Sequence, residues 1–271
     1  MFEFLILSGV LVLMFALRSY THPVFFRLSI LCLPLMGALI GWFLFEHWVA
    51  VVVGLVAWLV LPTLEIFVRV GRLRIPKVRQ LRPMRAPSDE EFPMLDDLTE
   101  EVQREGFKLV DDVGWDFEDL RQFYRLFYRE EDRALATIAL QLQGPSSFYH
   151  VSIVSRSKDD HVWMTWNYPF ALTMKLPPHL KVNRQRPELP FFDMHQNHLG
   201  FLALAGMNTD QLREQDPDDL SELLQKDISS QIDHNLKAGL LVLENEEQVR
   251  YSWRGLAYIF FQFLRDLVRV R

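Results

Sequence analysis

The chain has 271 residues, of which 49% are hydrophobic, and a formal net charge of −6. Residues 1–88 carry a net charge of +6 and residues 89–271 carry −12, and an acidic C-terminal part disfavours nucleic acid as a partner because it repels phosphate backbones. The single cysteine, Cys32, excludes a disulfide framework within the chain.

Three apolar runs occupy residues 1–68. Residues 2–17 are interrupted only by Glu3, residues 28–45 contain no charge, and residues 48–68 contain only Glu65. A bilayer core about 30 Å thick is crossed by roughly 20 apolar residues in a helix. We therefore expect three transmembrane helices at about 2–17, 28–45 and 48–68, the last two forming a hairpin at Glu46 and His47. The alternative for the first run is a helix lying in the membrane plane.

Cations flank these runs unevenly. Arg18 and Arg27 lie between the first two runs, and the turn at Glu46 has no lysine or arginine. A basic juxtamembrane linker, residues 69–88, holds Arg69, Arg72, Arg74, Lys77, Arg79, Arg82 and Arg85. The positive-inside rule predicts a multi-pass protein of the cell inner membrane, with the N-terminus outside and the C-terminal domain cytoplasmic. The linker cations either fix this topology alone or also contact anionic lipids at the membrane surface.

Gly37 and Gly41 form a G-x-x-x-G pair within the second apolar run. Small residues four positions apart let two helices approach closely. The pair predicts helix packing, either inside one chain or between two copies of it.

Residues 89–206 are expected to form one cytoplasmic α+β domain. A capping-box pattern at Ser88 and Glu91 predicts a helix to Glu105, and residues 107–110 favour a strand. Apolar residues at three- and four-residue spacing predict an amphipathic helix over residues 117–128. Residues 134–143, 148–155 and 161–166 predict an antiparallel meander with helices over one face. An irregular connection over residues 169–190 and a helix over 191–204 follow.

Residues 207–271 predict a helix–β-hairpin–helix segment, with helices over 218–237 and 254–271. This order resembles half of a winged-helix domain, but the exposed positions of its first helix are acidic, the wrong sign for DNA. These positions are Asp218, Asp219, Glu222, Asp227 and Asp233. The last helix combines an apolar face that includes Phe260 and Phe263 with Arg265 and Arg269. That face is expected either to dock into the domain core or to rest on the membrane surface.

Two groups of histidines are the candidates for chemistry. Asp193, His195 and His198 carry ligand types that zinc accepts, but the H-E-x-x-H glutamate and a fourth ligand are missing. His150 and His161 lie near Ser152, Ser155 and Asp160 without a G-x-S-x-G motif. We therefore expect no cofactor and no metal site.

The leading expectation is a membrane-anchored interaction or scaffold domain within a membrane protein complex. Its expected partners are membrane lipids and either another protein or a second copy of the chain. One alternative is a small-ligand sensor, with Trp163, Trp166 and Tyr168 lining the site. The other, less favoured because catalytic motifs are missing, is an enzyme that uses His195 and His198 or His150 and His161.

Overall fold

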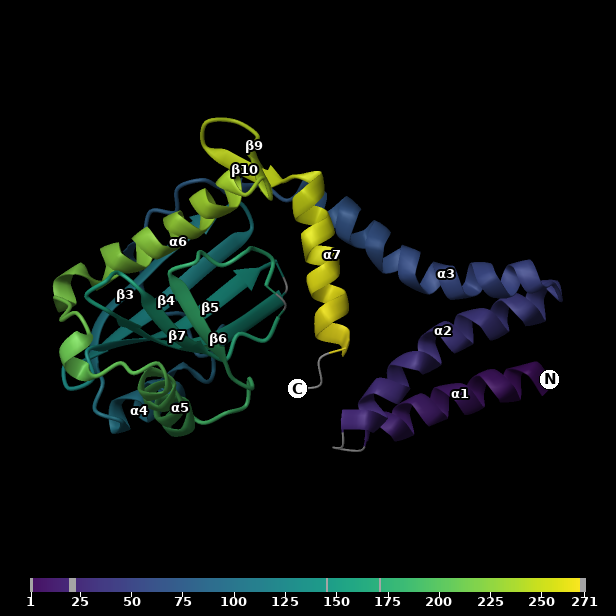
Figure 1. Cartoon of the computed structure of the whole chain (residues 1–271), viewed down its shortest axis with the longest axis horizontal. Coiled ribbons are helices and arrows are strands. Elements are labelled where there is room, and N and C mark those ends of the chain that lie inside the picture. Colours follow the sequence, from purple (N-terminus) through teal and green to yellow (C-terminus); the bar gives the residue numbers. More distant parts are fainter. Residues whose placement is uncertain (1, 20–22, 145, 171, 269–271) are drawn as a thin grey trace.

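The computed structural model describes residues 2–19, 23–144, 146–170 and 172–268. A helical arm of α1 (Phe2–Arg18), α2 (Pro23–Phe45) and α3 (Trp48–Glu65) extends from a domain that holds the sheets (Figure 1). Within the described residues, one helix is long and apolar enough to cross a membrane, at Leu28–Phe45 of α2. A second is obtained if the bent pair Trp48–Trp58 and Thr63–Val70 is one span.

The arm continues into the domain through residues that belong to both of its sheets. A π-helical turn, η1 (Ile66–Val70), ends α3 and is followed by β1 (Ile75–Pro76) and β2 (Arg82–Pro83). β1 pairs with β10 (Gln248–Tyr251), and β2 pairs with β3 (Lys108–Phe117). The segment expected as a linker therefore contributes one short strand to each of the two sheets of the domain.

The larger sheet has seven strands in the order β2-β3-β4-β5-β6-β7-β8. The other strands are β4 (Leu120–Arg129), β5 (Ala134–Gln143), β6 (Ser146–Arg156), β7 (Val162–Trp166) and β8 (Leu180–Arg184). All neighbours are antiparallel except β7 and β8, which are parallel. The expected meander is confirmed as β5, β6 and β7. The expectation of an irregular connection over 169–190 was wrong where β8 forms, because residues 180–184 pair with β7.

The expected helix over residues 117–128 was wrong. These residues end β3, turn at Glu118 and Asp119, and form β4. β4 is buried on both faces, with Phe123 and Phe127 in one apolar cluster and Tyr124 and Leu126 in the other. A strand covered on both sides has apolar residues at nearly every position, and such a run can match helical spacing by chance.

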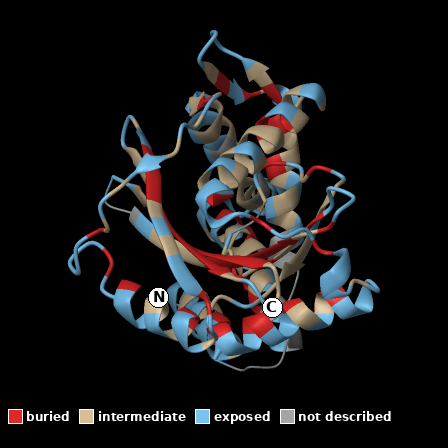
Figure 2. Cartoon of the chain, turned by 90° about the vertical axis from the view of Figure 1, so that its left-hand side faces the viewer, coloured by how far each residue is buried: buried red, intermediate tan, exposed pale blue. Residues whose placement is uncertain are grey.

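Helices cover both faces of this sheet, not one as expected. α4 (Leu95–Arg104) and α5 (Phe191–Leu204) lie over one face, where Phe107 and Phe191 are buried. α6 (Leu220–Lys237) crosses the other, with Leu220 fully buried (Figure 1). The buried residues concentrate in the sheet between these layers (Figure 2). α4 begins at Leu95 and not after Ser88, although the Glu91 carboxylate accepts a 3.1 Å hydrogen bond from the Ser88 backbone.

The C-terminal segment is helix–hairpin–helix, as expected. Short 3-10 turns η2 (Thr209–Gln211) and η3 (Pro217–Asp219) precede α6, and β9 (Leu241–Leu243), β10 and α7 (Trp253–Val268) follow it. β1, β10 and β9 form a three-stranded sheet in that order. A third apolar cluster joins this sheet to α6 and α7 through Leu241, Val249, Ile232 and Leu256, and Phe67 of η1 packs against it.

Candidate functional site

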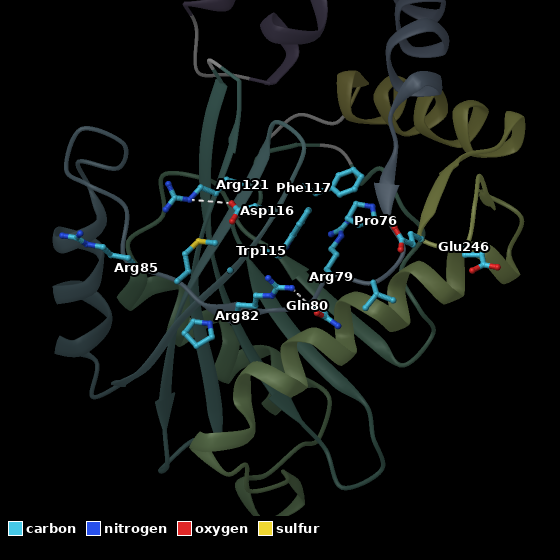
Figure 3. Close-up of a pocket in the computed structure, with 15 residues that line it drawn as sticks. Pro76, Arg79, Gln80, Arg82, Arg85, Trp115, Asp116, Phe117, Arg121 and Glu246 are labelled. Carbon is cyan, nitrogen blue, oxygen red and sulfur yellow. Dashed lines mark hydrogen bonds and ion pairs between the residues drawn. The ribbon is translucent and has the colours of Figure 1, made fainter.

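An arginine-lined groove separates residues 76–85 from the end of β3 (Figure 3). Its volume is about 930 Å³, and it is partly open to solvent. Its lining includes Arg79, Arg82, Arg85, Trp115 and Arg121, with Glu246 and Glu247 at the tip of the β9–β10 hairpin. Three of the seven linker cations expected at the membrane surface therefore line this groove on the domain.

Arg79 lies on the indole of Trp115. Its guanidinium carbon is 4.8 Å from the Trp115 ring centroid, which is cation–π contact. Nε of Arg79 is buried and has no hydrogen-bond acceptor among the described residues. Burial lowers the pKa of Arg79 from its usual value, because desolvation penalises the charged form. A charged donor that is desolvated without an acceptor favours binding of an anion.

The other groove arginines differ in how far they are neutralised. Arg121 pairs with Glu91 at 3.1 Å and lies 3.9 Å from Asp116. Arg82 and Arg85 are exposed, and in the part of the chain that the structure describes neither forms an ion pair; Arg82 reaches only the side-chain oxygen of Gln80, at 3.5 Å. The groove lining thus holds four arginines against three carboxylates, those of Asp116, Glu246 and Glu247, on a domain that is acidic as a whole.

The groove also borders an open edge of β3. β2 pairs with β3 only at Val113 and Gly114, and Met84 N–H donates to the Asp112 carbonyl at 2.9 Å. In an antiparallel strand, the N–H and C=O groups of every second residue point to the same edge. Those of Gly114 point toward β2, so those of Asp116, two residues later, point toward the groove. No described strand pairs with Asp116 on that side. An extended segment in the groove could add to the sheet at this position.

The residues of the weak metal candidate are not brought together. Asp193 is exposed, whereas His195 and His198 are buried on the sheet side of α5. The His195 ring lies between two carboxylates, with Nε2 2.9 Å from Asp132 and Nδ1 3.2 Å from Glu105. The described residues contain no group of three or more His, Cys, Asp or Glu side chains that could hold a metal ion.

His198 is a core histidine held by two hydroxyl groups. Nε2 lies 3.0 Å from Ser155 Oγ and Nδ1 lies 3.0 Å from Thr165 Oγ1. Burial, together with a smaller contribution from the neighbouring His195, lowers the pKa of His198 to about 3. The imidazole therefore stays neutral at physiological pH and fastens α5 to β6 and β7.

His150 and His161 do not form a site with Ser155. His161 is exposed at the start of β7, and Ser155 is bonded to His198. His150 lies with its ring edge-on to Trp166 and Tyr168, and burial lowers its pKa to about 4. A nucleophile–base hydrogen bond is missing at this position among the described residues.

The aromatic residues of the sensor alternative lie on opposite faces of β7. Trp163 packs against Phe201 of α5, with ring centroids 5.2 Å apart. Trp166 stacks on Tyr168 at 5.2 Å, on the face away from α5. These rings contact other side chains of the domain and do not line one shared cavity.

The glycine pair of α2 lies against α3 in the same chain. A Cβ on Gly37 would lie 2.4 Å from the Gly54 carbonyl oxygen, and a Cβ on Gly41 would lie 2.1 Å from that of Ala50. These distances are shorter than any van der Waals contact, so the hairpin requires glycine at both positions. Of the two alternatives left by the sequence, this geometry corresponds to packing inside one chain.

The remaining residues expected at the membrane surface lie near the end of the arm and on α7. Arg69 is paired with Glu65 at 3.2 Å and Arg74 with Glu244 at 2.8 Å, whereas Arg72 and Lys77 form no ion pair within the described residues. On α7, Phe260 is half-buried, and Phe263 and Arg265 are exposed. Arg269 lies outside the described residues.

Sequence reasoning missed Trp115 and Arg121 as members of a site. Trp115 was in no predicted element, and Arg121 was assigned to a helix that does not exist. The available signal was the alternation of charged and apolar residues from Asp112 to Phe117, which is typical of a strand at a sheet edge.

No family model matches this chain, and neither the curated proteins nor the solved structures contain a match to it.

Proposed function

We propose that the chain is a membrane-anchored binding protein whose domain captures an acidic, extended segment of a partner protein in the arginine-lined groove. The anchor is the helical arm, with α1, α2 and α3 as three spans, the N-terminus outside and the domain in the cytoplasm. The observation that carries the proposal is the set of three arginines, Arg79, Arg82 and Arg85, which have no carboxylate partner among the described residues and lie beside an open strand edge.

Charge and shape both favour an acidic polypeptide as the occupant. Guanidinium groups bind carboxylates through paired hydrogen bonds, so a segment with several Asp or Glu residues would supply the acceptors that these arginines lack. The groove is partly open to solvent, so a polypeptide can enter it, whereas small ligands favour enclosed pockets. The free peptide groups of Asp116 would pair with the backbone of that segment.

The orientation of the arm supports a cytoplasmic groove. The cations at Arg18, Arg27 and residues 69–85 flank the same end of the predicted spans. The groove begins at Pro76, only a few residues after η1, so its occupant would belong to a membrane protein or to a protein recruited to the membrane. This position suits a subunit that holds partners together at the membrane.

The test is site-specific photocrosslinking in native membranes. A photoreactive amino acid at Val78, which lines the groove and is 58% exposed, is compared with one at Phe192 on α5, which is 55% exposed. We expect a discrete crosslinked partner from position 78 that is missing at position 192. We also expect the double variant Arg82→Glu, Arg85→Glu to abolish it, whereas Lys181→Glu with Arg213→Glu leaves it unchanged. A partner insensitive to the groove charge reversal contradicts the proposal.

A further inference from the structure

α7 has one docked face and one uncovered face. Leu256 and Ile259 are buried in the apolar cluster shared with α6 and the small sheet. About 100° of rotation per residue places Trp253, Ala257, Phe261 and Leu264 together on an adjacent side, roughly 120° around the helix from Leu256 and Ile259. Trp253 is 73% exposed and Phe261 is 65% exposed. The expectation that the last helix docks into the core thus describes only its inner face.

Cations border this uncovered apolar stripe. Helical rotation places Arg254 and Arg265 along one border of this stripe, and both are exposed. Neither forms an ion pair with a described carboxylate. Aromatic and aliphatic residues beside unpaired arginines are the composition of helices that lie in the headgroup region of a bilayer.

The start of α7 is fixed to the end of the arm. The ring centroids of Trp253 and Phe67, which lies in η1, are 4.7 Å apart. Leu256 Cδ1 lies 3.4 Å from the point that a Cβ on Gly71 would occupy. From this attachment α7 runs crosswise to α3, between the arm and the domain, in two different views (Figures 1 and 3). If the arm crosses a membrane, a helix with this direction lies along the membrane surface and not through it.

We propose that the uncovered face of α7 lies on the anionic phospholipid headgroups of the membrane that anchors the chain, with Trp253, Phe261 and Leu264 inserted and Arg254 and Arg265 on lipid phosphates. This inference rests on the proposed anchoring by α2 and α3, and it does not depend on an occupant of the groove. Because η1 holds α7 at the membrane exit, the local lipid concentration is high and a weak intrinsic affinity is sufficient.

The contact would fix the orientation of the whole domain. α7 also packs on β10 and α6 through the third apolar cluster, so a surface-bound α7 cannot rotate without the small sheet. The groove, which ends at the β9–β10 hairpin, would then be held at a fixed distance from the membrane surface.

The test measures lipid contact in the full chain reconstituted in nanodiscs of neutral and anionic phospholipids. In a Cys32→Ala background, a fluorescent label is attached through Phe261→Cys, and in separate samples through Phe192→Cys on α5 or Val53→Cys on α3. Lipids that carry a nitroxide near the headgroup or in the middle of the acyl chain act as quenchers. Phe192 is the matched control, because it is an exposed phenylalanine on α5, a helix that lies away from α7 and the arm (Figure 1).

We expect the headgroup quencher to remove most of the fluorescence at position 261 and little at position 192. The acyl-chain quencher should act at position 53. Replacement of Arg254 and Arg265 by Gln should reduce quenching at 261 in anionic but not in neutral bilayers. Quenching at 53 without quenching at 261 overturns the contact of α7 with lipid, whereas loss of quenching at 53 overturns the anchoring itself. If the label at position 261 is shielded from solvent only after a protein extract is added, this face binds a protein partner, and the inference is also overturned.

Discussion

Arg125 of β4 and Asp112 of β3 are joined by two parallel hydrogen bonds. Nε lies 2.9 Å from Oδ1 and Nη2 lies 2.8 Å from Oδ2, while Nη1 donates to Thr99 Oγ1 of α4 at 3.0 Å. The side chains are only 11% and 23% exposed. The Asp112 carboxylate raises the pKa of Arg125 by hydrogen bonding to its charged form. This pair ties two strands and α4 together on the face away from α6.

We expect Asp112→Ala to lower the free energy of unfolding by about 2–3 kcal/mol, because it leaves a largely buried guanidinium with Thr99 as its only acceptor among the described residues. Glu130→Ala is the control, since its pair with Lys108 is exposed on both sides and contributes little. Unfolding of the full chain in detergent, followed by tryptophan fluorescence, measures both. Equal losses for the two variants would show that the buried pair is worth no more than a surface one.

Part of this fold could be read from the sequence and part could not. β5, β6 and β7 were predicted because turn residues such as Gly144 and Asp160 separate them. β4 was not, because a strand buried on both faces loses its two-residue alternation. Its turn was also hidden, since Glu118 takes a left-handed φ of 52°, a conformation that glycine or asparagine usually signals.

The groove was beyond sequence reasoning for a related reason. Arg79 and Arg85 belong to a cation cluster in the sequence. Because this cluster follows an apolar run, a role in membrane topology or lipid contact was enough to explain it. Trp115 lies against Arg79 in a part of the domain where β2 pairs with β3 over only two residues. A pairing this short leaves no periodic pattern of its own, so the alternation from Asp112 to Phe117 indicates a strand but not the groove beside it.

Acidification should destabilise the domain through its buried histidines. The pKa of His150 is lowered to about 4 and that of His198 to about 3, whereas an unfolded chain titrates near pH 6.5. Below pH 6.5 the unfolded state binds protons that the native state does not, so the free energy of unfolding decreases as the pH is lowered. Each histidine contributes up to about 1.4 kcal/mol per pH unit within its window.

His150→Phe removes one of these titrations together with a buried nitrogen that lacks a hydrogen-bond partner among the described residues. The variant should lose less stability than the wild type between pH 6.5 and pH 4, as measured by thermal unfolding at a series of pH values. Tyr168→Phe alters the same aromatic cluster without removing a group that titrates in this window, and should keep the wild-type slope. An unchanged slope in the His150 variant would be evidence that this imidazole becomes charged in the native state.

Gly37→Leu should separate α2 from α3. The Gly54 carbonyl oxygen occupies the space that the new side chain requires, and backbone atoms cannot move aside as a flexible side chain does. We expect a lower melting temperature of the arm in detergent and aggregation on size-exclusion chromatography. Gly9→Leu on α1 is the matched control, since nothing lies within 4 Å of its added Cβ. If Gly37→Leu instead converts a dimer into a stable monomer, the glycine pair packs between chains.

The orientation of the arm is tested by reporter fusions at two points. The start of α1 and the α2–α3 turn lie at one end of the arm, and η1 and the domain lie at the other (Figure 1). Cations gather at the domain end, whereas Glu46 and His47 at the turn include no lysine or arginine. The positive-inside rule therefore predicts a cytoplasmic domain and an external turn.

A fluorescent reporter that matures only in the cytoplasm should be active when fused after Arg85, and alkaline phosphatase at the same point should be silent. After Glu46 the two reporters should exchange their behaviour, because only α2 and the residues before it would then set the topology. In this truncated form, Arg18 and Arg27 are the cations that set the orientation of α1 and α2. Replacing both with Glu should therefore reverse the orientation that the Glu46 fusions report. It should affect the Arg85 fusions less, since the cations after η1 still favour the cytoplasm. Cytoplasmic activity at both fusion points would mean that α3 does not cross the membrane, and periplasmic activity after Arg85 would invert the orientation on which the groove and α7 proposals depend.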